Sequence, residues 1–219
     1  MINSILFNFC FNHAKQFLEQ GRYDWDLPHT KSVIYYAYNI AKKENADIKV
    51  LTIAAMFHDV GYFKLFEKGT SNNAVTISKN KKRHMVNGAK IVNKFFADNK
   101  NFFKNHLTKQ QQKRIEHLVL RHDEVLDLKD NDEVILMEAD TLGAVDVTRL
   151  KPNFEIESAK KYIKGFHNKR VKMFKTETGK NYLKILLPNF YKFYKNQKGF
   201  DLEDFVKNND EIVVCDFLK

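Results

Sequence analysis

A histidine and an aspartate stand side by side at residues 58 and 59, at the end of an apolar, alanine-rich segment. Residues 54–61 read AAMFHDVG. Neighbouring residues on a helix point about 100° apart, so His58 and Asp59 do not share a narrow stripe, but both can line a cavity inside a helical bundle. Polar groups in so apolar a setting are costly unless they are hydrogen-bonded or bind a metal. The pair therefore predicts a buried polar site that other residues must complete.

Further histidines and aspartates lie on the apolar faces of other predicted helices. They are His29, His84, His122 and Asp140. One such histidine is more often a hydrogen-bonded core residue than a ligand, but here five helices each contribute a polar group. Histidine and carboxylate together suit Zn, Mn, Fe or Ni, and helical bundles can project such side chains inward around metal ions. We predict a site for a divalent metal ion here, with Mg as a further candidate.

The elements that must position these residues are helices. Apolar residues recur at three- to four-residue intervals, which is typical of amphipathic helices. Three prolines and eight glycines are few for a sheet-rich fold with many turns. The pattern predicts helices over 3–20, 29–41, 48–59, 84–95, 109–123, 132–149, 156–175 and 180–195. Residues 63–82 are polar and are predicted to form a long loop beside the site, and residues 211–218 a short strand or a final helical turn.

The chain is expected to fold as one all-α domain. Its 219 residues contain no internal repeat and no linker that would divide them. We place the metal-binding core at about 22–150 and a helical pair that completes the pocket at about 156–195. Cys10 and Cys215 lie at opposite ends of the chain, so a disulfide framework is not expected and a reducing cytoplasm is the default location.

No membrane association is predicted from the sequence. No stretch approaches the roughly 20 apolar residues that a membrane span needs. Residues 1–17 are apolar but interrupted by asparagines, which indicates an amphipathic helix and not a signal peptide. The formal net charge of +10 would suit nucleic acid, anionic lipid or a polyphosphate substrate. Because the lysines are spread along the whole chain, the charge equally fits a lysine-rich composition, and nucleic acid is not the favoured partner.

The order of the polar residues resembles the HD superfamily of metal-dependent phosphohydrolases. Residues 24–33 (DWDLPHTKSV) are similar to the "DW..H...V" segment of bacterial HD hydrolases that act on nucleotides, and 54–61 resemble "AALLHDIG". Residues 138–144 (EADTLGA) resemble "DAD.LDA", with glycine at 143 where an acid often stands. Residues 169–180 are similar to a "K..…T..GK" helix turn of the same subgroup. The resemblance thus covers most of 22–195 and implies an HD-type helical bundle.

The resemblance also implies roles for the residues. His29, His58, Asp59 and Asp140 would hold one metal, and His84 and His122 match the extra histidines of members that hold two, with Asp59 bridging. For His84 and His122, a place beside the ligands or in the core stays open. His58 and Asp59 would be catalytic, Asp59 by orienting the nucleophile. The remaining histidines are left unassigned: His13, His106, His117 and His167.

The implied reaction is hydrolysis of a nucleotide or a related small phosphate ester by a metal-activated water. Its phosphate oxygens require positive charge. The candidates that could supply it are Lys64, Lys169, Arg170 and Lys180. Each lysine taken alone also fits a solvated surface charge.

Several alternatives remain at this point. Residues 60–62 lack the acidic pair of some HD nucleotidases and alarmone hydrolases, which argues against those substrates. Trp25 and Tyr62 could stack on a base or sugar, or simply pack in the core. An HD-fold di-iron oxygenase and a non-catalytic module that binds nucleic acid or another ligand are the competing functions.

Overall fold

The architecture is entirely helical where the structure is described. A computed structural model describes residues 2–67, 74–154 and 156–195, and these contain no strand. The all-α prediction is therefore confirmed for this part of the chain. The helices are α1 (Ser4–Leu18), α2 (Asp26–Lys43), α3 (Ile48–Phe57), α4 (Ala74–Asp98), α5 (Lys100–Phe103), α6 (Lys109–Arg121), α7 (Asn131–Val145), α8 (Ile156–Gly165) and α9 (Glu177–Lys195). Single turns follow several of them: η1 (Val60–Tyr62), η2 (Val125–Asp127), η3 (Phe166–Arg170) and η4 (Val171–Met173).

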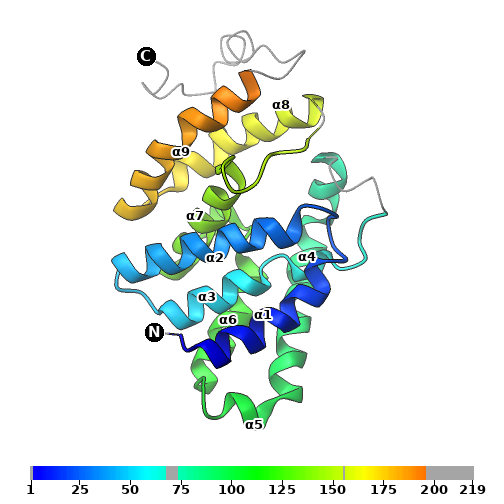
Figure 1. The fold of residues 1–219 in the computed structure, drawn as a ribbon, viewed down its shortest axis with the longest axis vertical. Coiled ribbons are helices and arrows are strands. Elements are labelled where there is room, and N and C mark those ends of the chain that lie inside the picture. The colour runs from blue at the N-terminus through cyan, green and yellow to red at the C-terminus, as the bar shows by residue number, and fades with distance from the viewer. Residues whose placement is uncertain (1, 68–73, 155, 196–219) are drawn as a thin grey trace.

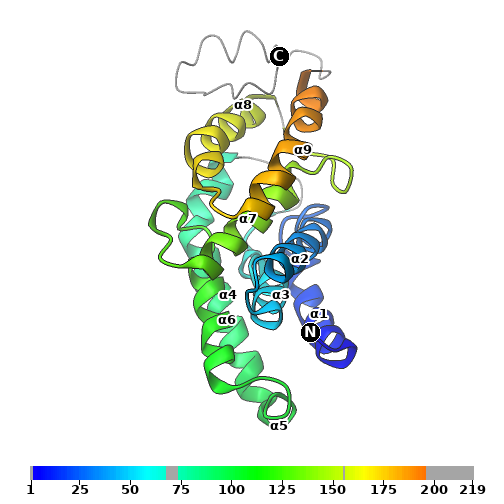
Figure 2. The ribbon, with the colours of Figure 1, turned by 90° about the vertical axis from the view of Figure 1, so that its left-hand side faces the viewer.

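Helix α2 lies at the centre of the bundle and packs against both α3 and α7. Helices α4 and α6 run beside each other along the length of the molecule, with α5 at one end (Figures 1 and 2). The pair α8 and α9 lies at the opposite end, where α9 packs against α7 and α8 against α4. Among the described residues, none of the helices combines the length and the apolarity needed to cross a bilayer.

Capping side chains account for where several helices begin. Asn3 accepts a hydrogen bond from the Leu6 amide at 2.8 Å, and Asp47 accepts from two amides of the first turn of α3, both at 3.0 Å. Thr108 and Gln111 form a capping box at the start of α6. Each cap satisfies amides that have no partner within the helix and stabilises the helix by about 1 kcal/mol.

Small residues bring α2 and α7 close together. The apolar stripe predicted on α2 is buried, and Val33, Ala37 and Ile40 have no exposed surface. A Cβ atom on Gly143 of α7 would come within 2.7 Å of the Val33 side chain, so this glycine is needed for the close approach. The result is that His29 on α2 faces Asp140 on α7.

Two predicted boundaries are wrong. Helix α4 begins at Ala74, so the loop predicted over 63–82 is shorter, and His84 lies inside the helix and does not open it. The run of Lys and Asn before His84 is typical of a loop, but such residues are also tolerated on the exposed face of a helix. The helix predicted over 156–175 leaves α geometry after Gly165 and continues as the π turn η3, in keeping with the low helix propensity of glycine.

The remaining predicted helices are present, with ends displaced by a few residues, as is usual for sequence patterns. Helix α9 begins at Glu177, earlier than predicted, because the Thr176 hydroxyl accepts a hydrogen bond from the Gly179 amide at 2.9 Å. The segment 211–218, predicted as a strand or helical turn, lies outside the described residues.

Candidate metal centre

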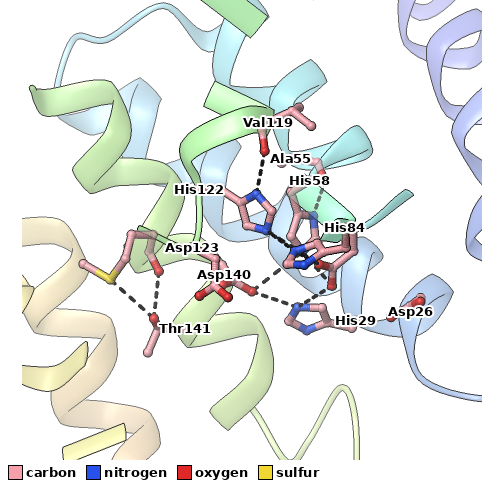
Figure 3. Close-up of polar contacts among 12 residues, drawn as sticks. Asp26, His29, Ala55, His58, His84, Val119, His122, Asp123, Asp140 and Thr141 are labelled. Carbon is pink, nitrogen blue, oxygen red and sulfur yellow. Dashed lines mark hydrogen bonds and ion pairs between the residues drawn. The ribbon is translucent and has the colours of Figure 1, made fainter. Parts of the chain in front are cut away.

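Six predicted ligands come together at one place inside the bundle. They are contributed by five separate helices or their ends, and none has more than 8% of its surface exposed. The six residues are His29 of α2, His58 and Asp59 at the end of α3, His84 of α4, His122 at the end of α6, and Asp140 of α7. Figure 3 labels His29, His58, His84, His122 and Asp140, whose side chains point toward one another.

One oxygen of Asp59 faces the side of the site formed by α2, α3 and α7. Asp59 Oδ2 lies 3.2 Å from His58 Nε2 and 3.8 Å from His29 Nε2. Asp140 Oδ1 completes this side, at 2.9 Å from His29 Nε2 and 3.7 Å from His58 Nε2. We call these three partners of Asp59 the first side of the site: His29, His58 and Asp140.

The other oxygen of Asp59 faces α4 and α6. Asp59 Oδ1 lies 3.6 Å from His84 Nε2 and 3.7 Å from His122 Nε2, and the two imidazole nitrogens are 3.1 Å apart. His84 and His122 form the second side of the site. The single carboxylate of Asp59 therefore belongs to two groups of ligand atoms that are compact enough to surround one ion each: His29, His58 and Asp59 on the first side, and Asp59, His84 and His122 on the second.

Backbone carbonyls orient three of the four imidazoles. His58 and His122 each place Nδ1 at 2.8 Å from the carbonyl oxygen three residues earlier, and His84 Nδ1 lies 3.4 Å from the carbonyl of Asn80. With Nδ1–H donating to a carbonyl, the lone pair of the ring is on Nε2, which points into the site. This is the arrangement that metal-ligating histidines use.

The donor set fits a divalent cation on both sides of Asp59. On the first side, His58 Nε2 is buried and has no hydrogen-bond partner. On the second side, two imidazole lone pairs would face each other across 3.1 Å with no hydrogen between them. Both features are unfavourable without a shared cation or proton. Nitrogen and carboxylate donors suit Zn, Mn, Fe or Ni.

Burial and neighbouring charges shift the pKa values of His58 and His84 in opposite directions. Burial by itself would lower the pKa of His58, but the carboxylates of Asp59 and Asp140 outweigh burial and raise it to about 9. Burial and the neighbouring His122 lower the pKa of His84 to about 3. Burial would raise the pKa of Asp59, yet His58 and Arg22 hold it well below its ordinary range. The carboxylate between the two sides therefore stays ionised.

Arg22 and Asp26 form a hydrogen-bonded network with Asp59. The sequence analysis did not single them out. Arg22 Nη2 donates to Asp59 Oδ2, and Arg22 Nε donates to Asp26 Oδ1 at 2.5 Å. The Arg22 guanidinium also lies 4.3 Å from the centre of the Tyr62 ring. Burial, which outweighs the attraction of Arg22, raises the pKa of Asp26 to about 7. The only signal in the sequence that could have identified them is their spacing. Arg22 precedes Asp26 by four residues, about one helical turn, and Asp26 precedes His29 by three.

Arg170 lies against the first side of the site. Its Nη1 donates to Asp140 Oδ2 at 2.8 Å, and its Nη2 donates to Asp123 Oδ1 at 2.5 Å. Asp123 was also missed from the sequence, although it follows His122 directly. Lys81 Nζ lies 3.6 Å from the same carboxylate. The π turn that interrupts the helix after Gly165 is what carries Arg170 to these two acids.

The other predicted phosphate-binding residues are placed differently. Lys169 is exposed and lines the same cavity as the metal ligands. Lys64 and Lys180 are not among the residues that line this cavity. Lys180 instead pairs with Glu177 at 2.9 Å, and the Lys64 ammonium lies 4.9 Å from the centre of the Phe63 ring.

The histidines left unassigned lie elsewhere where they are described. His117 pairs with Glu133 at 2.7 Å, and His13 stacks on Phe95 with ring centres 3.9 Å apart. His106 packs on a phenylalanine of α5, with ring centres 4.5 Å apart. The His167 side chain lies outside the described residues.

A cavity of about 660 Å³ opens onto the site. The ligands His29, Asp59, His84, His122 and Asp140 form part of its lining. Its other walls carry both cations and aromatic rings: Arg22, Lys79, Lys81, Lys161, Lys169, Arg170, Trp25, Tyr62, Phe154, Tyr162 and Phe166. Tyr62 already has two partners, because its ring stacks on His84 at 4.0 Å and lies beside the Arg22 guanidinium. A small molecule in this cavity would contact the polar cluster and the aromatic rings together.

A comparison with known families agrees with this geometry. The HD domain model matches residues 27–145, which is more than half of the chain and includes all six predicted ligands. No curated protein and no solved structure matches the chain. The chain belongs to the HD domain family, the superfamily of metal-dependent phosphohydrolases.

Proposed function

We propose that the protein is a metal-dependent phosphohydrolase that acts on a nucleotide or a related small phosphate ester. The observation that carries the proposal is the position of Asp59. Its Oδ2 faces His29 and His58 and its Oδ1 faces His84 and His122, beside a cavity large enough for a small molecule. Family membership supports the reaction class.

In this proposal, His29, His58, Asp59 and Asp140 would hold one divalent cation, and Asp59, His84 and His122 would hold a second. When bound, such ions lower the pKa of a water ligand toward neutrality and supply a nucleophile at physiological pH. Asp59 would orient the attacking water by accepting a hydrogen bond from it. Its low pKa suits this role, because an ionised carboxylate is an acceptor only.

The surrounding cations have two separate tasks. Arg22 is a positioning residue that holds Asp59 through a buried ion pair, since its guanidinium is tied to Asp59 and Asp26 at once. Lys161, Lys169 and Arg170 line the cavity and supply positive charge for the phosphate oxygens of the substrate. Arg170 also neutralises Asp140 from the side opposite His29.

The experiment is a metal analysis of the purified protein combined with a hydrolysis screen. Nucleoside mono-, di- and triphosphates, cyclic nucleotides and a generic phosphodiester are supplied with Mn²⁺, Mg²⁺, Fe²⁺, Zn²⁺ or Ni²⁺. We expect bound divalent metal and release of phosphate or nucleoside from at least one class. The matched variants are Asp59→Asn, in the site, and His117→Ala, a histidine paired with Glu133 outside the cavity.

Two results would overturn the proposal. Hydrolysis that is unchanged in Asp59→Asn would place the activity elsewhere. A protein that holds two irons and consumes oxygen, with no hydrolysis in any of the metals, would assign the same ligands to oxidative chemistry.

A further inference from the structure

The cavity has one wall made of aromatic rings, and this wall starts at a metal ligand. Trp25 stacks on His29, with ring centres 5.6 Å apart and planes 23° apart. Phe154 follows at 5.8 Å from Trp25, and Tyr162 of α8 stacks on Phe154 at 5.2 Å. We call Trp25, Phe154 and Tyr162 the aromatic wall. All three line the cavity.

Part of the aromatic wall is accessible from the cavity. Trp25 is buried, with 6% of its surface exposed, whereas Phe154 and Tyr162 are half-buried. Burial raises the pKa of the Tyr162 hydroxyl, so the ring presents a neutral phenol. An apolar surface with few polar atoms is therefore offered to a ligand that reaches the polar cluster at His29.

Apolar side chains also line the cavity from other elements. Leu126 of η2 is 70% exposed and Val75 of α4 is 45% exposed, and both are among the lining residues together with Ile77. Exposed apolar side chains gathered around a concave site are typical of ligand-binding pockets. The polar metal cluster and this apolar lining therefore favour a ligand with two unlike parts.

Positive charge lies next to the aromatic wall. Lys161 precedes Tyr162 on α8, and both line the cavity. Arg170 lines the same cavity as Tyr162. The cavity therefore offers cations to a phosphate group and apolar, aromatic contacts to a planar ring. A nucleotide has both a phosphate and a planar base. Sugar phosphates and alkyl phosphates lack the flat π face that suits aromatic side chains.

We propose that the aromatic wall is the subsite for the nucleobase of the substrate, with Phe154 and Tyr162 as the residues that determine preference for a base-bearing phosphate ester. This inference rests on the proposed function, which it makes more specific. The base packs against the aromatic wall while the phosphate lies toward Asp59 and the lysines. Selectivity comes from contact with the ring and does not require recognition of a particular base.

The test uses the only tryptophan of the chain, because Trp25 belongs to the wall. The metal-loaded protein is titrated with adenosine, uridine, ribose 5-phosphate and hexyl phosphate while tryptophan fluorescence is recorded. We expect saturable changes with both nucleosides, although they carry no phosphate, and none with ribose 5-phosphate. Adenosine and uridine 5′-monophosphates should compete with the nucleosides and bind more tightly than ribose 5-phosphate by about tenfold or more.

Variants separate contact with the base from general damage to the fold. Phe154→Leu and Tyr162→Leu should lower the preference for nucleoside monophosphate over ribose 5-phosphate by about tenfold. Tyr182→Leu is the matched control, because Tyr182 is a half-buried aromatic residue of α9 that packs on Tyr36, and it does not line the cavity. The control should leave the preference unchanged. Thermal melts of all three variants establish that each one is folded.

The two proposals fail in different ways. Equal affinity for ribose 5-phosphate and nucleoside monophosphates, or hexyl phosphate binding as tightly as they do, would overturn the nucleobase subsite even if hydrolysis is observed. Saturable nucleoside binding that is weakened by Phe154→Leu would support the subsite even if no phosphate ester is hydrolysed, and then only the proposed reaction would be lost.

Discussion

The two sides of the Asp59 carboxylate are built differently, although each consists of two histidines that share one acid. The first side adds a second carboxylate, Asp140, and its ligands come from α2, α3 and α7 in the centre of the bundle. The second side has only His84 and His122 beside Asp59, and they come from α4 and α6. More anionic ligands bind a divalent cation more strongly. We therefore expect the first side to hold its ion more tightly.

The two sides also differ in how their helices are brought together. The first side depends on contacts among helices that pack against each other along their length. The second side depends on the approach of α4 to the turn η1. A Cβ atom on Gly61 would come within 1.8 Å of the His84 carbonyl oxygen, so only glycine allows α4 to pack here. The second side therefore depends on the close packing of α4 against η1, outside the central group of α2, α3 and α7.

The largest expected effect comes from the residue that both sides share. Asp59→Asn keeps the shape of the side chain but removes the charge that faces all four imidazoles. We expect both ions to be lost and hydrolysis to fall by more than about 100-fold, since even residues that only support metal ligands cost about 10–100-fold when mutated. Metal content by mass spectrometry and initial rates measure the two effects. Retention of one full equivalent of metal would mean that Asp59 does not join the two sides.

The next effect separates the two sides. His58→Ala should lose the ion of the first side and abolish hydrolysis. His84→Ala should lose one equivalent of metal, keep the other, and lower activity more than it lowers thermal stability. His117→Ala serves as the control for loss of a histidine outside the site. If His84→Ala lowers the melting temperature but leaves metal content and activity intact, His84 is a packing residue.

The difference between the two sides also explains which site residues could be predicted from the sequence. Each sequence signal for the first side lies within one helix. His58 and Asp59 adjoin each other after an alanine-rich run, and His29 and Asp140 lie on apolar helix faces. The roles of His84 and His122 were left open, because nothing in their own helices shows that both turn toward Asp59. That depends on packing between α4, η1 and α6, which involves residues far apart in the chain.

The supporting residues were the hardest to predict. Arg22 is an ordinary basic residue in a chain with 37 lysines and arginines, and only its contact with Asp59 distinguishes it. Arg170 is predicted from the sequence as a candidate for phosphate binding, but its ion pair with Asp140 is not. Glu138 was noticed only as part of a motif. In the structure its carboxylate accepts hydrogen bonds from the amides of residues 175 and 176, at 2.6 and 2.9 Å, and so ties the start of α9 to α7. Such long-range pairs leave no periodic pattern in the sequence.

Removing the metal should reveal the unequal affinity of the two sides. An ion that binds only the folded state stabilises it by about 2.7 kcal/mol at 100 times its dissociation constant. We expect a chelator to lower the melting temperature of the wild-type protein, and the shift should be smaller in His84→Ala, which has one ion fewer to lose. Titration with chelator should release the second-side ion first. Release of both ions at the same chelator concentration would contradict the difference in affinity inferred from the ligands.

The smallest effect is the response of the metal-free protein to pH, to which His58 and His84 should contribute with opposite signs. The folded-state pKa of His84 is about 3, below its ordinary value of 6.5, so the unfolded chain binds a proton that the folded chain does not. Its contribution to stability is therefore lost as the pH falls below 6.5, by up to about 1.4 kcal/mol per pH unit. The folded-state pKa of His58 is about 9, so its contribution is complete below 6.5 and is lost as the pH rises through 9.

Urea unfolding of the chelated protein between about pH 5 and pH 9 measures both slopes. His84→Gln should flatten the acidic side and leave the alkaline side unchanged. Burial also lowers the pKa of His29, so some acidic slope remains, and the difference between wild type and variant isolates His84. An equally steep acidic side in His84→Gln would mean that His84 is not held neutral in the folded state. The second side would then carry positive charge next to Asp59, and the case for a cation between His84 and His122 would lose its electrostatic basis.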